Sequence, residues 1–126
     1  MRFIFIIFVM VIFNTNLFSQ NSGCYVFRYY INNSPGKEKN FCQDGMARCT
    51  LQIHNNNTSN NCTDYKYKWY KKANECQNMD EITGADENKY IFYLDMTGTT
   101  NYKVIVTSQD VNGDMVEDAS ECFVIT

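Results

Sequence analysis

The sequence lacks most of the residue patterns on which known enzymes depend. Its 126 residues contain one His and one Pro, and no GxSxG, HExxH or P-loop motif occurs. A two-His catalytic pair or a His-rich metal site therefore cannot form, and we expect no cofactor. A basic excess is also missing, because 11 Lys and Arg face 14 Asp and Glu. The net charge of −3 argues against a nucleic-acid binder that works by bulk positive charge.

Only one long apolar run occurs, between Phe3 and Phe13, and it lies between Arg2 and the small residue Ser19. This order is typical of a secretory signal peptide. The run is shorter than the about 20 residues that cross a membrane, so an uncleaved anchor fits less well. We expect a signal peptide over residues 1–19, a single domain over 20–126, and a secreted protein without a membrane segment after cleavage.

Six cysteines follow the expected signal peptide. Small secreted domains commonly use disulfides, so an even count predicts up to three bonds of open connectivity. A metal site fits poorly because the sequence has no CxxC motif. The expected disulfide residues are Cys24, Cys42, Cys49, Cys62, Cys76 and Cys122.

Apolar and polar residues alternate with a period of two, which predicts strands buried on one face. In YKYKWYKK, for example, Tyr65, Tyr67 and Trp69 share one face. We predict at least six strands and no helix, over residues 24–31, 47–54, 65–72, 89–94, 101–109 and 121–126.

Polar turns separate these segments, and Asn112-Gly113 is a strong hairpin signal because both residues tolerate positive φ. An isolated antiparallel sheet could not bury this many aromatic residues. The pattern therefore predicts an all-β, antiparallel two-sheet sandwich.

The C-terminal half resembles a known family. From Tyr65 onward it reads YKYKWYKK and then ITGADENKYIFYLDMTGTTNYKVIVTSQDVNGD, which is similar to the C-to-G half of immunoglobulin-like domains, including PKD-type variants. Trp69 corresponds to the core Trp of strand C, and Tyr102 to the Tyr that opens strand F. The resemblance implies an immunoglobulin-like sandwich that acts by binding.

One position departs from the family pattern. Strand F of antibody-type domains carries a Cys two residues after its Tyr, whereas this chain has Val104 there. The usual bridge from Cys49 to strand F is therefore absent. Either Cys49 pairs elsewhere, or strand B does not lie at 47–54.

The residues of this chain that belong to types used in catalysis have simpler, structural explanations. His54 falls on the polar face of a predicted strand, which favours a surface side chain over a general base. Acidic neighbours on a strand point to opposite faces, so solvated loops explain them better than a glycosidase-like pair. These neighbours are Asp80-Glu81, Asp86-Glu87 and Glu117-Asp118.

The segment DVNGD also resembles part of a calcium loop, because Asp110, Asn112 and Asp114 alternate oxygen donors. The remaining ligands of such a loop are missing, so we interpret the segment as the hairpin and expect no metal. Four N-x-S/T motifs predict glycosylation on a eukaryotic chain, at Asn32, Asn56, Asn57 and Asn61.

A candidate binding face follows from strand alternation and the resemblance. Lys66, Lys68 and Tyr70 would share an outer sheet face with Lys103 and Ile105. Three interpretations are open: a solvated face, a contact face for a protein or acidic glycan, and a single-stranded nucleic-acid site, which the inward turn of Trp69 and its neighbouring tyrosines disfavours.

We therefore expect a secreted, non-catalytic module that binds an extracellular protein or glycan, and neither nucleic acid nor membrane. The first alternative is a secreted effector or immunomodulator that sequesters a host cytokine or chemokine. A small secreted enzyme or inhibitor, or a structural coat component, are further alternatives.

Overall fold

A computed structural model describes residues 22–39, 48–57, 61–93 and 98–126. The expected signal peptide and Cys42 lie outside these ranges. Within them the chain forms strands and no helix, so no helix there could cross a membrane. The strands are β1 (Phe27–Ile31), β2 (Ser34–Pro35), β3 (Glu38–Lys39), β4 (Arg48–Asn55), β5 (Thr63–Ala73), β6 (Asp80–Glu81), β7 (Lys89–Tyr93), β8 (Thr100–Gln109), β9 (Met115–Ala119) and β10 (Phe123–Ile125).

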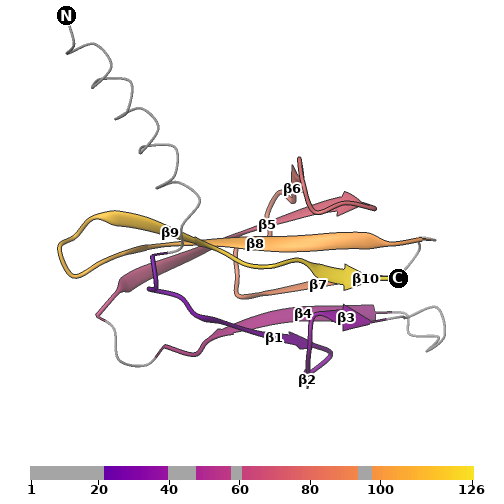
Figure 1. Cartoon of the computed structure of the whole chain (residues 1–126), viewed down its shortest axis with the longest axis horizontal. Helices are drawn as coiled ribbons and strands as arrows, with labels where there is room; N and C mark the ends of the chain where they lie inside the picture. Colours follow the sequence, from indigo (N-terminus) through magenta and orange to yellow (C-terminus); the bar gives the residue numbers. More distant parts are fainter. Residues whose placement is uncertain (1–21, 40–47, 58–60, 94–97) are drawn as a thin grey trace, which may run out of the picture.

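The strands form two sheets packed as a sandwich, which confirms the expected fold class. Sheet A has the order β2-β1-β4-β7, and sheet B has the order β3-β10-β8-β5-β6, with β9 also paired to β8. Only β3 and β10 run parallel. In Figure 1 the long strands β5 and β8 lie side by side in one layer, with β1 and β4 in the other. The strands β2, β3, β6 and β9 were not predicted from the sequence.

The predicted alternation places the core between the two sheets. Cys49, Leu51 and Ile53 of β4 are fully buried, and Trp69 and Val104 face them from sheet B. Tyr65 and Tyr67 are partly buried against the same cluster, as their shared face with Trp69 predicts. The side chains that alternate with these inner residues therefore point to the outer faces of the sheets.

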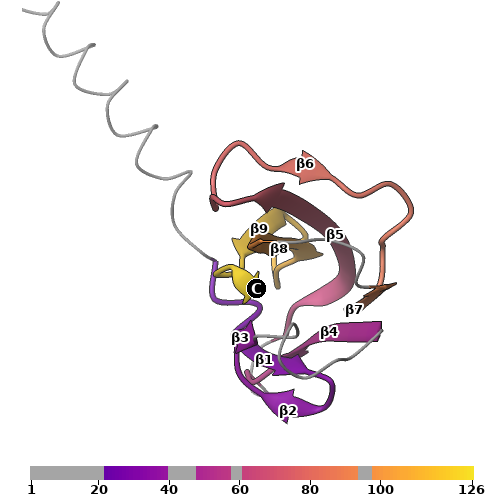
Figure 2. The ribbon, with the colours of Figure 1, turned by 90° about the vertical axis from the view of Figure 1, so that its right-hand side faces the viewer.

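Trp69 lies at the centre of this core and organises the segment that follows β6. Its ring lies 6.1 Å from that of Tyr90 and 5.9 Å from that of Phe123, measured between centroids. Its carbonyl accepts the Ile82 N–H at 2.8 Å, and its indole N–H donates to the Glu87 carbonyl at 2.7 Å. The segment between β6 and β7 is thus held at both ends, and it runs down one side of the sandwich (Figure 2).

The two disulfides of the structure lie at opposite ends of β5. Cys24 bonds Cys62 just before this strand, and Cys76, just after it, bonds Cys122. Cys49 is free and buried, so the expectation that it forms a disulfide is not met. Strand β4 includes residues 48–54 of the predicted segment, and Cys49 lies within the apolar core.

The hairpin at Asn112-Gly113 forms as expected. Gly113 has φ +84°, and one Asp110 carboxylate oxygen accepts N–H groups of Asn112 and Asp114 at 2.9 and 3.0 Å. Asp110 therefore stabilises the turn itself. The returning strand is β9, whereas the sequence had assigned this pairing to the final segment over 121–126. Ser120, just after β9, donates its N–H to the Val104 carbonyl, and β10 then pairs with the start of β8.

Asp118 corrects a sequence-based expectation, because its side chain is fully buried rather than part of a solvated acidic pair. It lies opposite Val106 in the β8–β9 register and so shares the inner face. Its carboxylate accepts the Ser22 N–H and hydroxyl at 2.6 Å each, and the N–H groups of Gly23 and Tyr25 at 3.1 Å. This carboxylate ties the segment before β1 to sheet B.

Replacing Asp118 removes a buried carboxylate that accepts four hydrogen bonds. We expect Asp118→Ala to lower the free energy of unfolding by about 3 kcal/mol, because four donors lose a carboxylate acceptor that is itself fully buried. Urea unfolding of the oxidised protein measures this change. The control is Glu117→Ala at the exposed neighbour, expected to stay within about 0.5 kcal/mol of the parent. Equal loss in both variants would contradict this role of Asp118.

Candidate functional site

The predicted binding residues lie together on the outer side of sheet B. The β5–β8 register pairs Lys68 with Ile105, and Tyr70 with Lys103, while Lys66 lies one row further along. Lys66 and Lys68 are exposed, and the other three are partly buried. We call this group the β5–β8 face. Its members turn away from the core because Trp69 and Val104 occupy the inner positions between them.

The strands on either side give the β5–β8 face mixed charge. Glu81 of β6 lies opposite Tyr70, and its Oε2 is 3.8 Å from the Lys68 Nζ. Both side chains are about half exposed, so this ion pair contributes little stability. On the other side, Ala119 of β9 lies opposite Ile105. The strands of sheet B together contain six Lys and six acidic residues, so the sheet has no charge excess.

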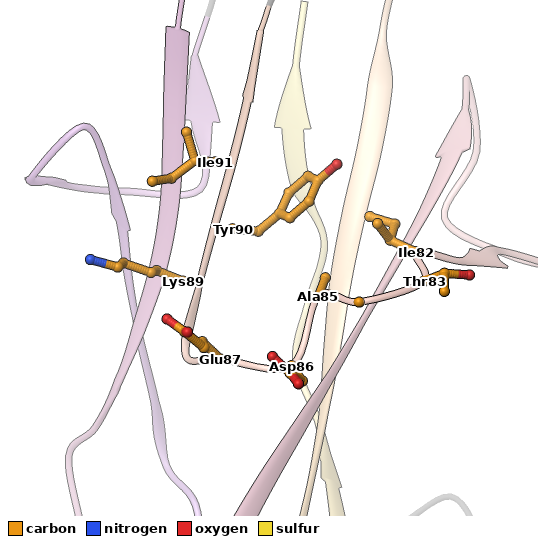
Figure 3. Close-up of a pocket in the computed structure, with 9 residues that line it drawn as sticks. Ile82, Thr83, Ala85, Asp86, Glu87, Lys89, Tyr90 and Ile91 are labelled. Atoms are coloured by element: carbon orange, nitrogen blue, oxygen red, sulfur yellow. The ribbon is translucent and has the colours of Figure 1, made fainter.

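An open hollow of about 320 Å³ lies where the β6–β7 segment meets β7. Figure 3 shows Ile82, Ala85 and Tyr90 on one side of it, with Asp86 and Glu87 at its base. Both acidic residues are exposed, as expected for a solvated loop. Lys89 and Ile91 point to the opposite side of β7 from Tyr90 (Figure 3).

A second hollow, of about 310 Å³, was not predicted from the sequence because it joins three strands that are distant along the chain. It lies between β7, the end of β5 and the start of β8. Aromatic rings line it, with Phe92 stacked on Tyr102 at 4.7 Å. Lys71 could have indicated this hollow from the sequence. It lies on the same strand face as Trp69, where a charged side chain must reach the edge of the sandwich. The lining residues are Lys71, Lys72, Ala73, Asp80, Tyr90, Phe92, Tyr93, Thr100 and Tyr102.

The structure separates the four expected glycosylation positions by accessibility. Asn56 and Asn61 are exposed. The Asn57 side-chain amide donates to the Gly23 carbonyl at 2.8 Å, and the Asn32 side-chain oxygen accepts the Thr50 N–H at 2.9 Å. A glycan on Asn57 would have to disturb its hydrogen bond to Gly23.

His54 is exposed, in agreement with its expected surface position, and its ring meets that of Tyr30 edge-on at 5.1 Å. Among the residues that the structure describes, no group of three or more His, Cys, Asp or Glu side chains could hold a metal ion. Comparison of the chain with protein-family models, with curated proteins and with solved structures finds no match.

The free thiol of Cys49 gives a test of the packing. Burial raises its pKa to about 12, and the thiolate is the reactive form. We expect iodoacetamide at about pH 8 to label Cys49 at least about 100-fold more slowly in the folded protein than in guanidinium, as followed by peptide mass spectrometry. Similar labelling rates in the two states would contradict the buried position of this thiol.

Proposed function

We propose that this protein is a secreted, non-catalytic, immunoglobulin-like module that recognises another extracellular molecule through the β5–β8 face. The observation that carries the proposal is the strand register, which brings Lys66, Lys68, Tyr70, Lys103 and Ile105 together on the outer side of sheet B. The two disulfides agree with secretion, because such bonds persist in oxidising compartments.

Strand order supports the immunoglobulin-like part of the proposal. The strands β1, β4 and β7 share one sheet, while β5, β8 and β10 share the other, as strands A, B, E and C, F, G do in that family. Trp69 and Tyr102 are buried between the sheets, where the family places its core Trp and Tyr. The family's strand-B Cys corresponds to the buried Cys49.

Although sheet B as a whole has no charge excess, the five residues of the β5–β8 face include three lysines and no acidic side chain, which favours an acidic partner. Tyr70 and Ile105 supply partly buried apolar surface, with the three lysines around them. Protein interfaces commonly combine an aromatic centre with a polar rim. The same lysines would repel a basic chemokine, so the alternative function of chemokine capture would need another surface.

The partner would first be captured from a panel of extracellular proteins and glycans, with reduced and alkylated protein as the control. We then expect Lys66→Glu combined with Lys68→Glu to weaken binding at least tenfold, because two attractive charges become repulsive. Biolayer interferometry of the oxidised protein measures the change. Arg48→Glu combined with Lys89→Glu, on the other sheet, is the matched control. Unchanged affinity in the first double variant would exclude this face.

The immunoglobulin-like assignment can be tested by restoring the missing family cysteine. We expect Val104→Cys to bond to Cys49 and to raise the free energy of unfolding by about 2 to 4 kcal/mol. Disulfide mapping by mass spectrometry, together with urea unfolding, gives the result. The control is Val106→Cys, which shares the strand and the inner face but not the family position. A bridge from position 106, or from neither position, would contradict the assignment.

A further inference from the structure

The outer face of sheet A has a charge pattern unlike the rest of the protein. The four strands of this sheet contain three basic residues, Arg28, Arg48 and Lys89, and no Asp or Glu. The strands of sheet B are balanced, and the whole chain carries −3. The strands of sheet A therefore have a net positive charge, although the whole chain is acidic.

All three basic side chains belong to the same outer face. Lys89 lies opposite Gln52, and Arg48 lies opposite Tyr93 on the same pair of strands. Arg28 lies opposite His54 on the other side of β4. The alternate positions of β4 are fully buried, so these basic residues point outward, and each of them is exposed.

The register also fixes the spacing of the charges along β4. With about 3.3 Å per residue and about 4.8 Å between strands, Arg48 and Lys89 are ~14 Å apart, and Lys89 and Arg28 are ~12 Å apart. A single small anion cannot bridge such distances. A linear chain with repeated negative charges would meet the three residues in turn along about 20 Å of the face.

The remaining side chains of this face fit a carbohydrate. Tyr93 is 70% exposed and Ile91 is 43% exposed, and both lie on β7 at the edge of sheet A. Tyr30 meets the His54 ring on the other side. Aromatic rings of this kind pack against the apolar faces of sugar rings, and Thr50 and Gln52 between them can hydrogen-bond hydroxyl groups.

We infer that the outer face of sheet A binds a sulfated polysaccharide chain that lies along β4. Two of its three cations are arginines, whose planar guanidinium groups bind oxyanions through paired hydrogen bonds. Nucleic acid is the less suitable polyanion, because the disulfides agree with an extracellular protein. This surface is separate from the β5–β8 face.

Heparin is the probe for the test, immobilised on a column and challenged with the oxidised mature protein. We expect retention at low salt, with elution as NaCl rises. The double variant Arg48→Glu with Lys89→Glu should lose at least tenfold in affinity for heparin in solution, while Lys66→Glu with Lys68→Glu changes it by less than about twofold. Thermal unfolding checks each fold, and Arg48→Gln with Lys89→Gln replaces the first pair if it does not fold.

Several results would overturn the inference. They are a lack of retention, equal loss in both double variants, equal binding of desulfated heparin, and equal competition by single-stranded oligonucleotides. Equal binding of desulfated heparin would show that sulfate plays no role, and equal competition by oligonucleotides would indicate that the face attracts polyanions in general. The protein-partner assay on the Arg48 and Lys89 variant keeps the two proposals apart, because each surface can then fail by itself.

Discussion

The indole N–H of Trp69 needs an acceptor inside an apolar core, and most of the structure depends on how this need is met. The Glu87 carbonyl accepts it at 2.7 Å. That bond places the segment before β7 along the side of the sandwich, so β7 adds to β4 with Tyr90 against the Trp69 ring. The inward position of Trp69 also turns its neighbours Lys68 and Tyr70 outward. One buried side chain thus determines the candidate face of sheet B and positions Lys89 on sheet A.

The ends of the sandwich are held by covalent and polar links rather than by the core. Disulfides attach both ends of β5, one to the segment before β1 and the other to the junction of β9 and β10. Near the first disulfide, Asp118 accepts four hydrogen bonds from the same N-terminal segment. A disulfide and a buried carboxylate at one place restrain the path into β1. The outward-facing residues between these two ends are therefore not needed to hold the sheets together.

The sequence was most informative where one strand face is buried along its whole length. The alternation around Trp69 and Val104 predicted β5 and β8, because a period of two needs no knowledge of distant residues. The resemblance was needed to place these two strands side by side, as their register shows. The sequence alone could not predict contacts between segments that are distant along the chain. Asp118 was expected in solvent, since its hydrogen-bond donors come from Ser22 to Tyr25, about a hundred residues earlier. Cys49 was expected in a disulfide because only the count of cysteines was available.

The basic face of sheet A was missed for a related reason. Arg28, Arg48 and Lys89 belong to three separate segments, and none of these segments is notably basic by itself. Only the pairing of β1, β4 and β7 brings them onto one surface.

The negative net charge does not prevent this surface from attracting anions. At physiological ionic strength, charges are screened over about 8 Å, and the two sheets of a sandwich already lie about 10 Å apart. A polyanion at sheet A therefore responds to the nearby arginines and lysine more than to the acidic residues of sheet B and its loops. The two proposed surfaces therefore depend on the local charge that strand pairing gives each sheet, and not on the net charge of the chain.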